Sequence, residues 1–123
     1  MKTINMFFSV AILLLTVSSA IAQSDKTQRT IGVKTQTIKA SGTCSMDKNR
    51  IETAAYSIDG VKSATWEQST QILTVTYSAF KKEAADNVQK RVADAGNDTE
   101  KYRADDIVYQ KLPDCCYYQR KQL

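Results

Sequence analysis

The chain has 123 residues and a formal net charge of +4. That length allows one small domain beside a targeting segment, and the scattered lysines and arginines argue against nucleic-acid binding. The sequence contains no histidine, which excludes a Cys–His nucleophile pair within the chain and removes the commonest neutral metal ligand. No paired-carboxylate spacing stands out either, so we do not expect an enzyme.

The first 22 residues have the pattern of a secretory signal peptide. Lys2 precedes an apolar run over residues 6–15, and Ala20 and Ala22 give the small-x-small form that signal peptidase accepts. The run is shorter than the about 20 apolar residues that cross a bilayer, which favours cleavage over a retained anchor. We therefore expect a periplasmic or secreted protein with no membrane segment after cleavage, and a flexible leader over residues 23–31.

The next segments predict a strand followed by a helix. Residues 32–40 alternate and contain Thr, Val and Ile, which favours a strand, and a Ser-Gly-Thr sequence at 41–43 breaks it. Residues 45–57 place Ile51 and Ala55 at helical spacing. The sequence therefore predicts a helix that begins just after the break.

The second half of the domain predicts two strands, a helix and a last strand. Residues 61–67 and 71–77 are typical of strands joined by a short turn. Ser78 is a candidate N-cap for a second helix that runs to Ala95 and is ended by a glycine. Residues 99–104 predict a short final strand.

This β-α-β-β-α-β order predicts an α+β fold. It is the ferredoxin-like βαββαβ sandwich, a four-stranded antiparallel sheet with two helices on one face. The domain spans residues 32–104, and a C-terminal tail with a cysteine pair follows at 105–123. The predicted core contains Ile51, Ala55, Leu73, Val88 and Val92.

The chemistry of the sequence is concentrated in three cysteines, Cys44, Cys115 and Cys116. Cys44 lies where the first strand meets the first helix, and the free N–H groups of a helix start stabilise a thiolate. Met46 adds a second soft sulfur two residues later. Soft sulfur ligands favour Cu(I), and thiolates also bind Zn(II).

Residues 34–102 resemble a heavy-metal-associated domain, the module of copper chaperones and metal-transporting ATPases. The resemblance rests on residues 42–52, on 60–64, where a Gly-Val pair opens the second strand, and on the alternating strand at 73–77. It implies the βαββαβ fold. It also implies a loop in which the two cysteines of a Cys-x-x-Cys motif hold a soft metal ion that is passed to partner proteins.

The chain departs from this pattern at two positions. Cys44 matches the first cysteine of the motif, but Asp47 stands where the second would be. A carboxylate is a poor ligand for Cu(I), although it is acceptable for Zn(II). Asn97 follows the second helix, where the resemblance implies an aromatic residue next to the metal.

The C-terminal tail can supply the missing ligand. In the predicted order the second helix ends on the same side of the sheet as Cys44, and a short helix over residues 105–111 would carry the chain back to that side. Cys115 or Cys116 would then meet Cys44. Three interpretations follow: a shared metal ion, a structural disulfide that leaves one free thiol, or tail cysteines independent of Cys44 in a metal-silent module.

We predict an exported protein that binds a soft or borderline metal ion, with Cu(I) ahead of Zn(II), for buffering or handover. The predicted ligands are Cys44, Cys115, Cys116, Met46 and Asp47. The expected partners are the metal ion and a metal-transport or acceptor protein. The alternative is a disulfide-stapled, metal-silent ferredoxin-like module for protein interaction.

Overall fold

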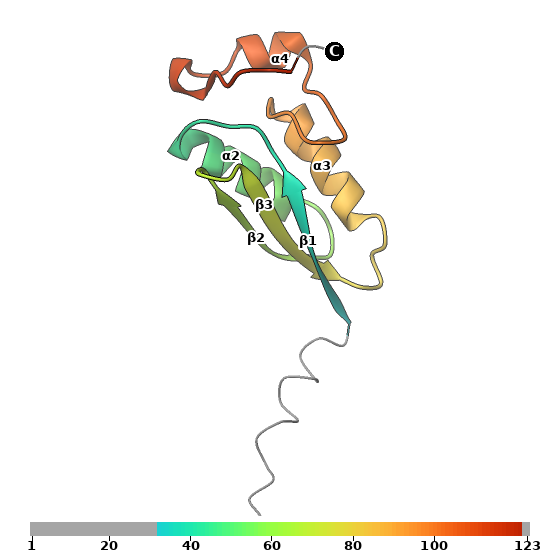
Figure 1. Ribbon diagram of the computed structural model, residues 1–123. Helices are drawn as coiled ribbons and strands as arrows, with labels where there is room; N and C mark the ends of the chain where they lie inside the picture. The colour runs from blue at the N-terminus through green and yellow to red at the C-terminus, as the bar shows by residue number, and fades with distance from the viewer. Residues whose placement is uncertain (1–31, 122–123) are drawn as a thin grey trace, which may run out of the picture.

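The computed structural model describes residues 32–121 (Figure 1). The predicted signal peptide at 1–22 and the predicted leader at 23–31 lie outside the described residues. Within residues 32–121, no helix combines the length and the apolar character that a membrane crossing requires.

Three antiparallel strands form the sheet, in the order β1-β3-β2. They are β1 (Val33–Lys39), β2 (Val61–Glu67) and β3 (Ile72–Ser78). The register places Gln36 opposite Val75 and Trp66 opposite Leu73. Because side chains alternate along a strand, Trp66, Leu73 and Val75 are buried, while the intervening residues of β2 and β3 are mostly polar and exposed.

Both long helices contribute to one core against this sheet. They are α2 (Ser45–Tyr56) and α3 (Ala84–Asp94); in Figure 1, α2 lies behind the strands and α3 lies to the right of β1. The five predicted core residues, Ile51, Ala55, Leu73, Val88 and Val92, are all buried in a single cluster. The α+β class, both helices and this core are therefore confirmed.

α3 begins later than the sequence predicts. Ser78 is the last residue of β3, opposite Val33, and not the N-cap of the helix. The N-cap is Glu83. Backbone N–H groups of Lys81 and Ala84 donate to the carbonyls of Ser78 (2.9 Å) and Lys81 (3.0 Å), so turns fill the segment in between. Strand pairing has overridden the capping preference of serine.

The predicted fourth strand at residues 99–104 is not formed in the described part of the chain. Only one bridge, between Ala40 and Thr99, joins it to the sheet. The segment makes its own hydrogen bonds instead: Thr99 N–H donates to the Tyr102 carbonyl (2.8 Å), and Ala104 N–H donates to an Asp98 carboxylate oxygen (2.7 Å). A local turn has replaced the ladder that β1 would have shared.

The tail returns across the end of the domain where α2 begins, as Figure 1 shows. It contains α4 (Asp106–Gln110), close to the short helix predicted at 105–111, and a 3₁₀ turn, η1 (Asp114–Cys116). A second, smaller apolar cluster lies beneath it. That cluster consists of Leu112, Cys116 and Tyr118, with Cys44 and Tyr109 packed against them.

Candidate metal centre

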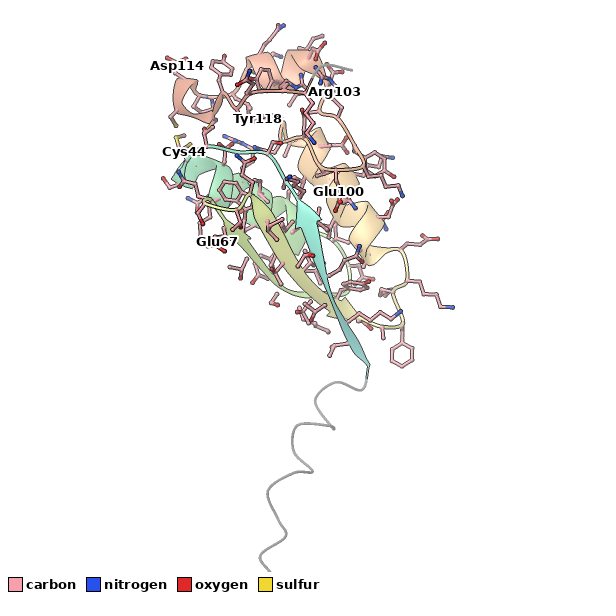
Figure 2. The ribbon with its side chains drawn as sticks, in the orientation of Figure 1. Cys44, Glu67, Glu100, Arg103, Asp114 and Tyr118 are labelled. Carbon is pink, nitrogen blue, oxygen red and sulfur yellow. The ribbon has the colours of Figure 1, made fainter. Side chains whose placement is uncertain are left out.

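Three thiols meet at the end of the domain that the tail covers. The sulfur of Cys44 lies 3.1 Å from that of Cys115 and 3.4 Å from that of Cys116, and the two tail sulfurs are 3.8 Å apart. All three cysteines are free. Figure 2 shows Cys44 below the turn that carries Asp114. Among the described residues, these three form the cluster with metal-ligand spacing.

Cys44 is positioned by the start of α2. It is the N-cap residue, with extended backbone (φ −145°, ψ 175°), so its side chain lies beside the first N–H groups of the helix. Burial alone would raise the pKa of the Cys44 thiol. Hydrogen bonds from the Cys115 thiol and from the Asp47 N–H outweigh this and lower the pKa.

The tail cysteines are held by η1 and by contacts to α2. The Thr43 hydroxyl donates to the Cys115 carbonyl (2.5 Å), while Cys116 is fully buried in the second cluster. The hydrogen bond from Cys115 to Cys44 raises the pKa of Cys115 to about 12, and burial raises the pKa of Cys116. Because thiolates are the ligands, a bound cation must displace these protons.

Asp47 lies beside the thiols, but its carboxylate faces the protein. It is 0% exposed. One oxygen accepts hydrogen bonds from the N–H groups of Thr43 (2.8 Å) and Cys44 (3.3 Å). The other accepts from Arg50 (2.7 Å) and Asn97 (2.8 Å). Both oxygens are thus engaged by donors from the loop, from α2 and from the segment after α3.

Arg50 and Asn97 complete this network, and neither residue was predicted to belong to the site. Asn97 is buried and joins the Ser41 carbonyl (2.9 Å) to Asp47. The Arg50 guanidinium contacts both Asp47 and Cys116: its Nη1 donates to the Asp47 carboxylate, and its Nη2 lies 3.5 Å from the Cys116 sulfur. The acid–base pair three residues apart on a predicted helix was the available signal for Arg50.

Met46 lies on the outer side of the cluster. Its Sδ is 3.5 Å from the Cys115 sulfur, and the side chain is 46% exposed. The structure therefore brings together four sulfurs from the loop and the tail, with Asp47 directed into the network beneath them.

The spacing of the thiols suits one shared ion. With Zn–S distances of about 2.3 Å, sulfurs of a tetrahedral site lie about 3.8 Å apart, and the observed separations of 3.1 to 3.8 Å reach this value. The four converging sulfurs are soft donors, while the nearby Asp47 Oδ2, 3.7 Å from the Cys44 sulfur, is hydrogen-bonded to the loop. The residues therefore fit a thiophilic cation, which small side-chain movements would centre.

Comparisons with known proteins bear on the fold. No protein-family model matches the chain, and no curated protein matches it. A structure described as "CopZ metallochaperone" is 27% identical, with a TM-score of 0.50 over 54% of this chain and 98% of that one. The "NMR solution structure of ZiaAN sub mutant" is 32% identical, with a TM-score of 0.46 over 55% and 94%. The likeness to the CopZ metallochaperone supports a heavy-metal-associated fold for this chain.

Proposed function

We propose that this chain binds one soft metal ion through the thiolates of Cys44, Cys115 and Cys116, and buffers it or hands it to an acceptor protein. One observation carries the proposal: three sulfurs from segments 71 and 72 residues apart converge within 3.8 Å of one another. The likeness to a metallochaperone supports a non-enzymatic carrier.

Cu(I) is the ion that we propose first, and Zn(II) is second. Three thiolates with a thioether alongside favour a soft monovalent cation. Zn(II) prefers four ligands, and the nearest carboxylate, on Asp47, is already engaged by the N–H groups of Thr43 and Cys44 and by Arg50 and Asn97. We therefore assign Asp47 the role of holding the loop and Arg50, and not that of a ligand.

The exposure of the ligands supports handover. Cys116 is buried, Cys44 is partly buried, and Cys115 is exposed beside Met46. An acceptor thiolate would reach the ion from the side of Cys115 and replace that ligand first. Export to the periplasm or medium, proposed from residues 1–22 alone, would place this exchange outside the cytoplasm.

The test is titration of the reduced, anaerobic full chain with Cu(I) against a chromophoric chelator, repeated with Zn(II). We expect one ion per chain. Cys44→Ser should weaken Cu(I) binding by about a hundredfold or more while the far-ultraviolet circular dichroism spectrum is kept, because a serine hydroxyl is not ionised at neutral pH. Cys115→Ser and Cys116→Ser should also weaken it strongly.

Ser45→Ala is the matched control, since it removes a hydroxyl next to Cys44 from an exposed position. Equal Cu(I) affinity of the wild type and all three cysteine variants would refute the proposal. A thiol assay on protein purified without reductant addresses the disulfide alternative: three reactive thiols exclude a disulfide, and a single one would indicate that a disulfide has formed.

A further inference from the structure

We infer that Asp98, Tyr118 and Arg120, which we call the tail latch, set the affinity of the metal centre by fixing the two tail thiols beside Cys44. The inference rests on the proposed function. The side-chain hydrogen bonds of the three residues go to groups other than the thiols, so they act as positioning residues. Asp98 belongs to the domain, whereas Tyr118 and Arg120 belong to the tail.

Tyr118 locks the tail to the end of α3. Its buried hydroxyl donates to the Gly96 carbonyl (2.8 Å) and accepts from the Asp98 N–H (2.8 Å). The Tyr109 hydroxyl donates to the Tyr118 carbonyl (2.6 Å), and the two rings meet edge to face, 5.1 Å apart. Because Tyr118 lies two residues after Cys116, these bonds fix the chain next to the thiols.

Arg120 forms a bidentate ion pair with Asp98. Its Nε and Nη2 donate to the two Asp98 oxygens at 3.0 and 2.8 Å. The guanidinium also lies over the Tyr109 ring, 4.6 Å from its centroid. Both side chains of the ion pair are largely buried, at 10% and 13% exposed, so this pair is screened less than a surface pair.

The latch matters because two of the three proposed ligands are on the tail. When only a fraction of molecules holds the tail in place, the apparent dissociation constant is the intrinsic one divided by that fraction. The latch keeps this fraction high before any ion arrives. The coupling is reciprocal. An ion that binds the docked form more tightly than the undocked form shifts the docking equilibrium of the tail by the ratio of those two affinities.

The test compares full-length Arg120→Met and Tyr118→Phe with the wild type. All three cysteines remain in both variants. We expect each variant to bind Cu(I) about tenfold more weakly or worse, a change of about 1.4 kcal/mol per tenfold, with Arg120→Lys recovering part of the loss. Arg91→Met, on the surface of α3, is the matched control and should bind as the wild type does.

Two further readouts separate positioning from general damage. Unfolding followed by the fluorescence of Trp66, which lies in the main core, should change little in the latch variants. Trypsin should cut after Lys111, a site present in both proteins, faster in metal-free Arg120→Met than in the wild type, and saturating Cu(I) should slow this cleavage. Slower cleavage in the presence of Cu(I) would show that ion binding and docking of the tail are coupled.

The outcomes distinguish the two proposals. A wild type that binds no Cu(I) or Zn(II) overturns the proposed function, and the coupling with it. A wild type that binds tightly, with Arg120→Met and Tyr118→Phe equally tight, overturns the latch alone. Weaker Cu(I) binding would also overturn the latch if the unfolding followed by Trp66 fluorescence showed an equal loss of stability. The defect would then be in the whole domain and not in the position of the tail.

Discussion

Asp47 stands where the predicted Cys-x-x-Cys pattern would have its second cysteine, and its carboxylate is buried. A carboxylate with no exposure to water is tolerated only when it is paired and fully hydrogen-bonded. Asp47 meets this condition through Arg50, Asn97 and two backbone N–H groups. Asp47 thus anchors the loop that carries Cys44.

Asp47→Asn tests this role. The amide loses the charge that pairs with Arg50 and presents an N–H₂ group to donors, so we expect the reduced, metal-free protein to lose about 3 kcal/mol of unfolding free energy. Urea denaturation measures it. Asp94→Asn, on the exposed side of α3, should change stability by less than about 0.5 kcal/mol. A loss below about 1 kcal/mol for Asp47→Asn would contradict the anchoring role.

The Cu(I) affinity of Met46→Leu tests whether the thioether binds the ion. The substitution nearly keeps the volume and removes the sulfur. The side chain is half exposed and reaches only Cys115 among the thiols, so we expect no more than a small loss of Cu(I) affinity in the chelator competition. A loss as large as that of Cys115→Ser would instead make Met46 a full ligand.

Among the secondary-structure elements, those defined by periodicity were predictable. The alternation in β2 and the helical spacing of α2 gave bounds within a residue or two of the observed ones. The predicted fourth strand is absent from residues 99–104, which the structure describes, because Thr99 and Ala104 bond locally, to Tyr102 and Asp98, and only Glu100 N–H donates to β1, at the Lys39 carbonyl. A strand propensity does not report such local bonds.

Gly96 links the end of α3 to the tail, which gives a prediction at this scale. Its φ is +112°, and a Cβ there would lie 2.9 Å from Leu112 Cδ2. Gly96→Ala should therefore cost about 1–2 kcal/mol from backbone strain and should also displace the tail.

Thermal unfolding and trypsin cleavage of the tail measure the two effects separately. Gly32→Ala is the control for strain alone, since Gly32 has φ +90° but its nearest contact is 3.8 Å away, at Phe80. If both variants leave the tail equally resistant to trypsin, the Leu112 contact does not hold it.

For the whole molecule, the meeting of residues far apart in the chain was only partly predictable. The direction of the last helix and the short helix before Cys115 indicated that the tail could return to Cys44. Nothing in the spacing of Asp98, Tyr118 and Arg120 indicated that they pair, because a contact between distant positions leaves no periodic pattern. The sequence alone therefore left metal, disulfide and separate thiols open.

The Asp98–Arg120 pair makes the docked tail sensitive to acid. Burial alone would raise the pKa of Asp98, but the hydrogen bond from Arg120 lowers it below its usual 3.8. The pair therefore stabilises the docked tail fully above about pH 4, and this contribution is lost as the pH falls through the lowered pKa.

This prediction is measured without a protease, for example by the amide hydrogen exchange of Tyr118. We expect the tail of the metal-free protein to undock below pH 4. Asp98→Asn should open more readily at neutral pH and should lose the acid dependence. An unchanged pH profile in Asp98→Asn would assign the transition to other carboxylates.

The sequence distance between the proposed ligands would have a consequence for the lifetime of the protein. A Cys-x-x-Cys pair closes a ring of a few residues, and its ion can leave without disturbing the rest of the chain. An ion shared by Cys44 and Cys115 closes a loop of 71 residues, and by chain entropy such a cross-link disfavours the unfolded state by about 4 kcal/mol. The loaded chain would resist proteolysis while the empty chain would be degraded sooner, so the abundance of the protein would follow the supply of its ion.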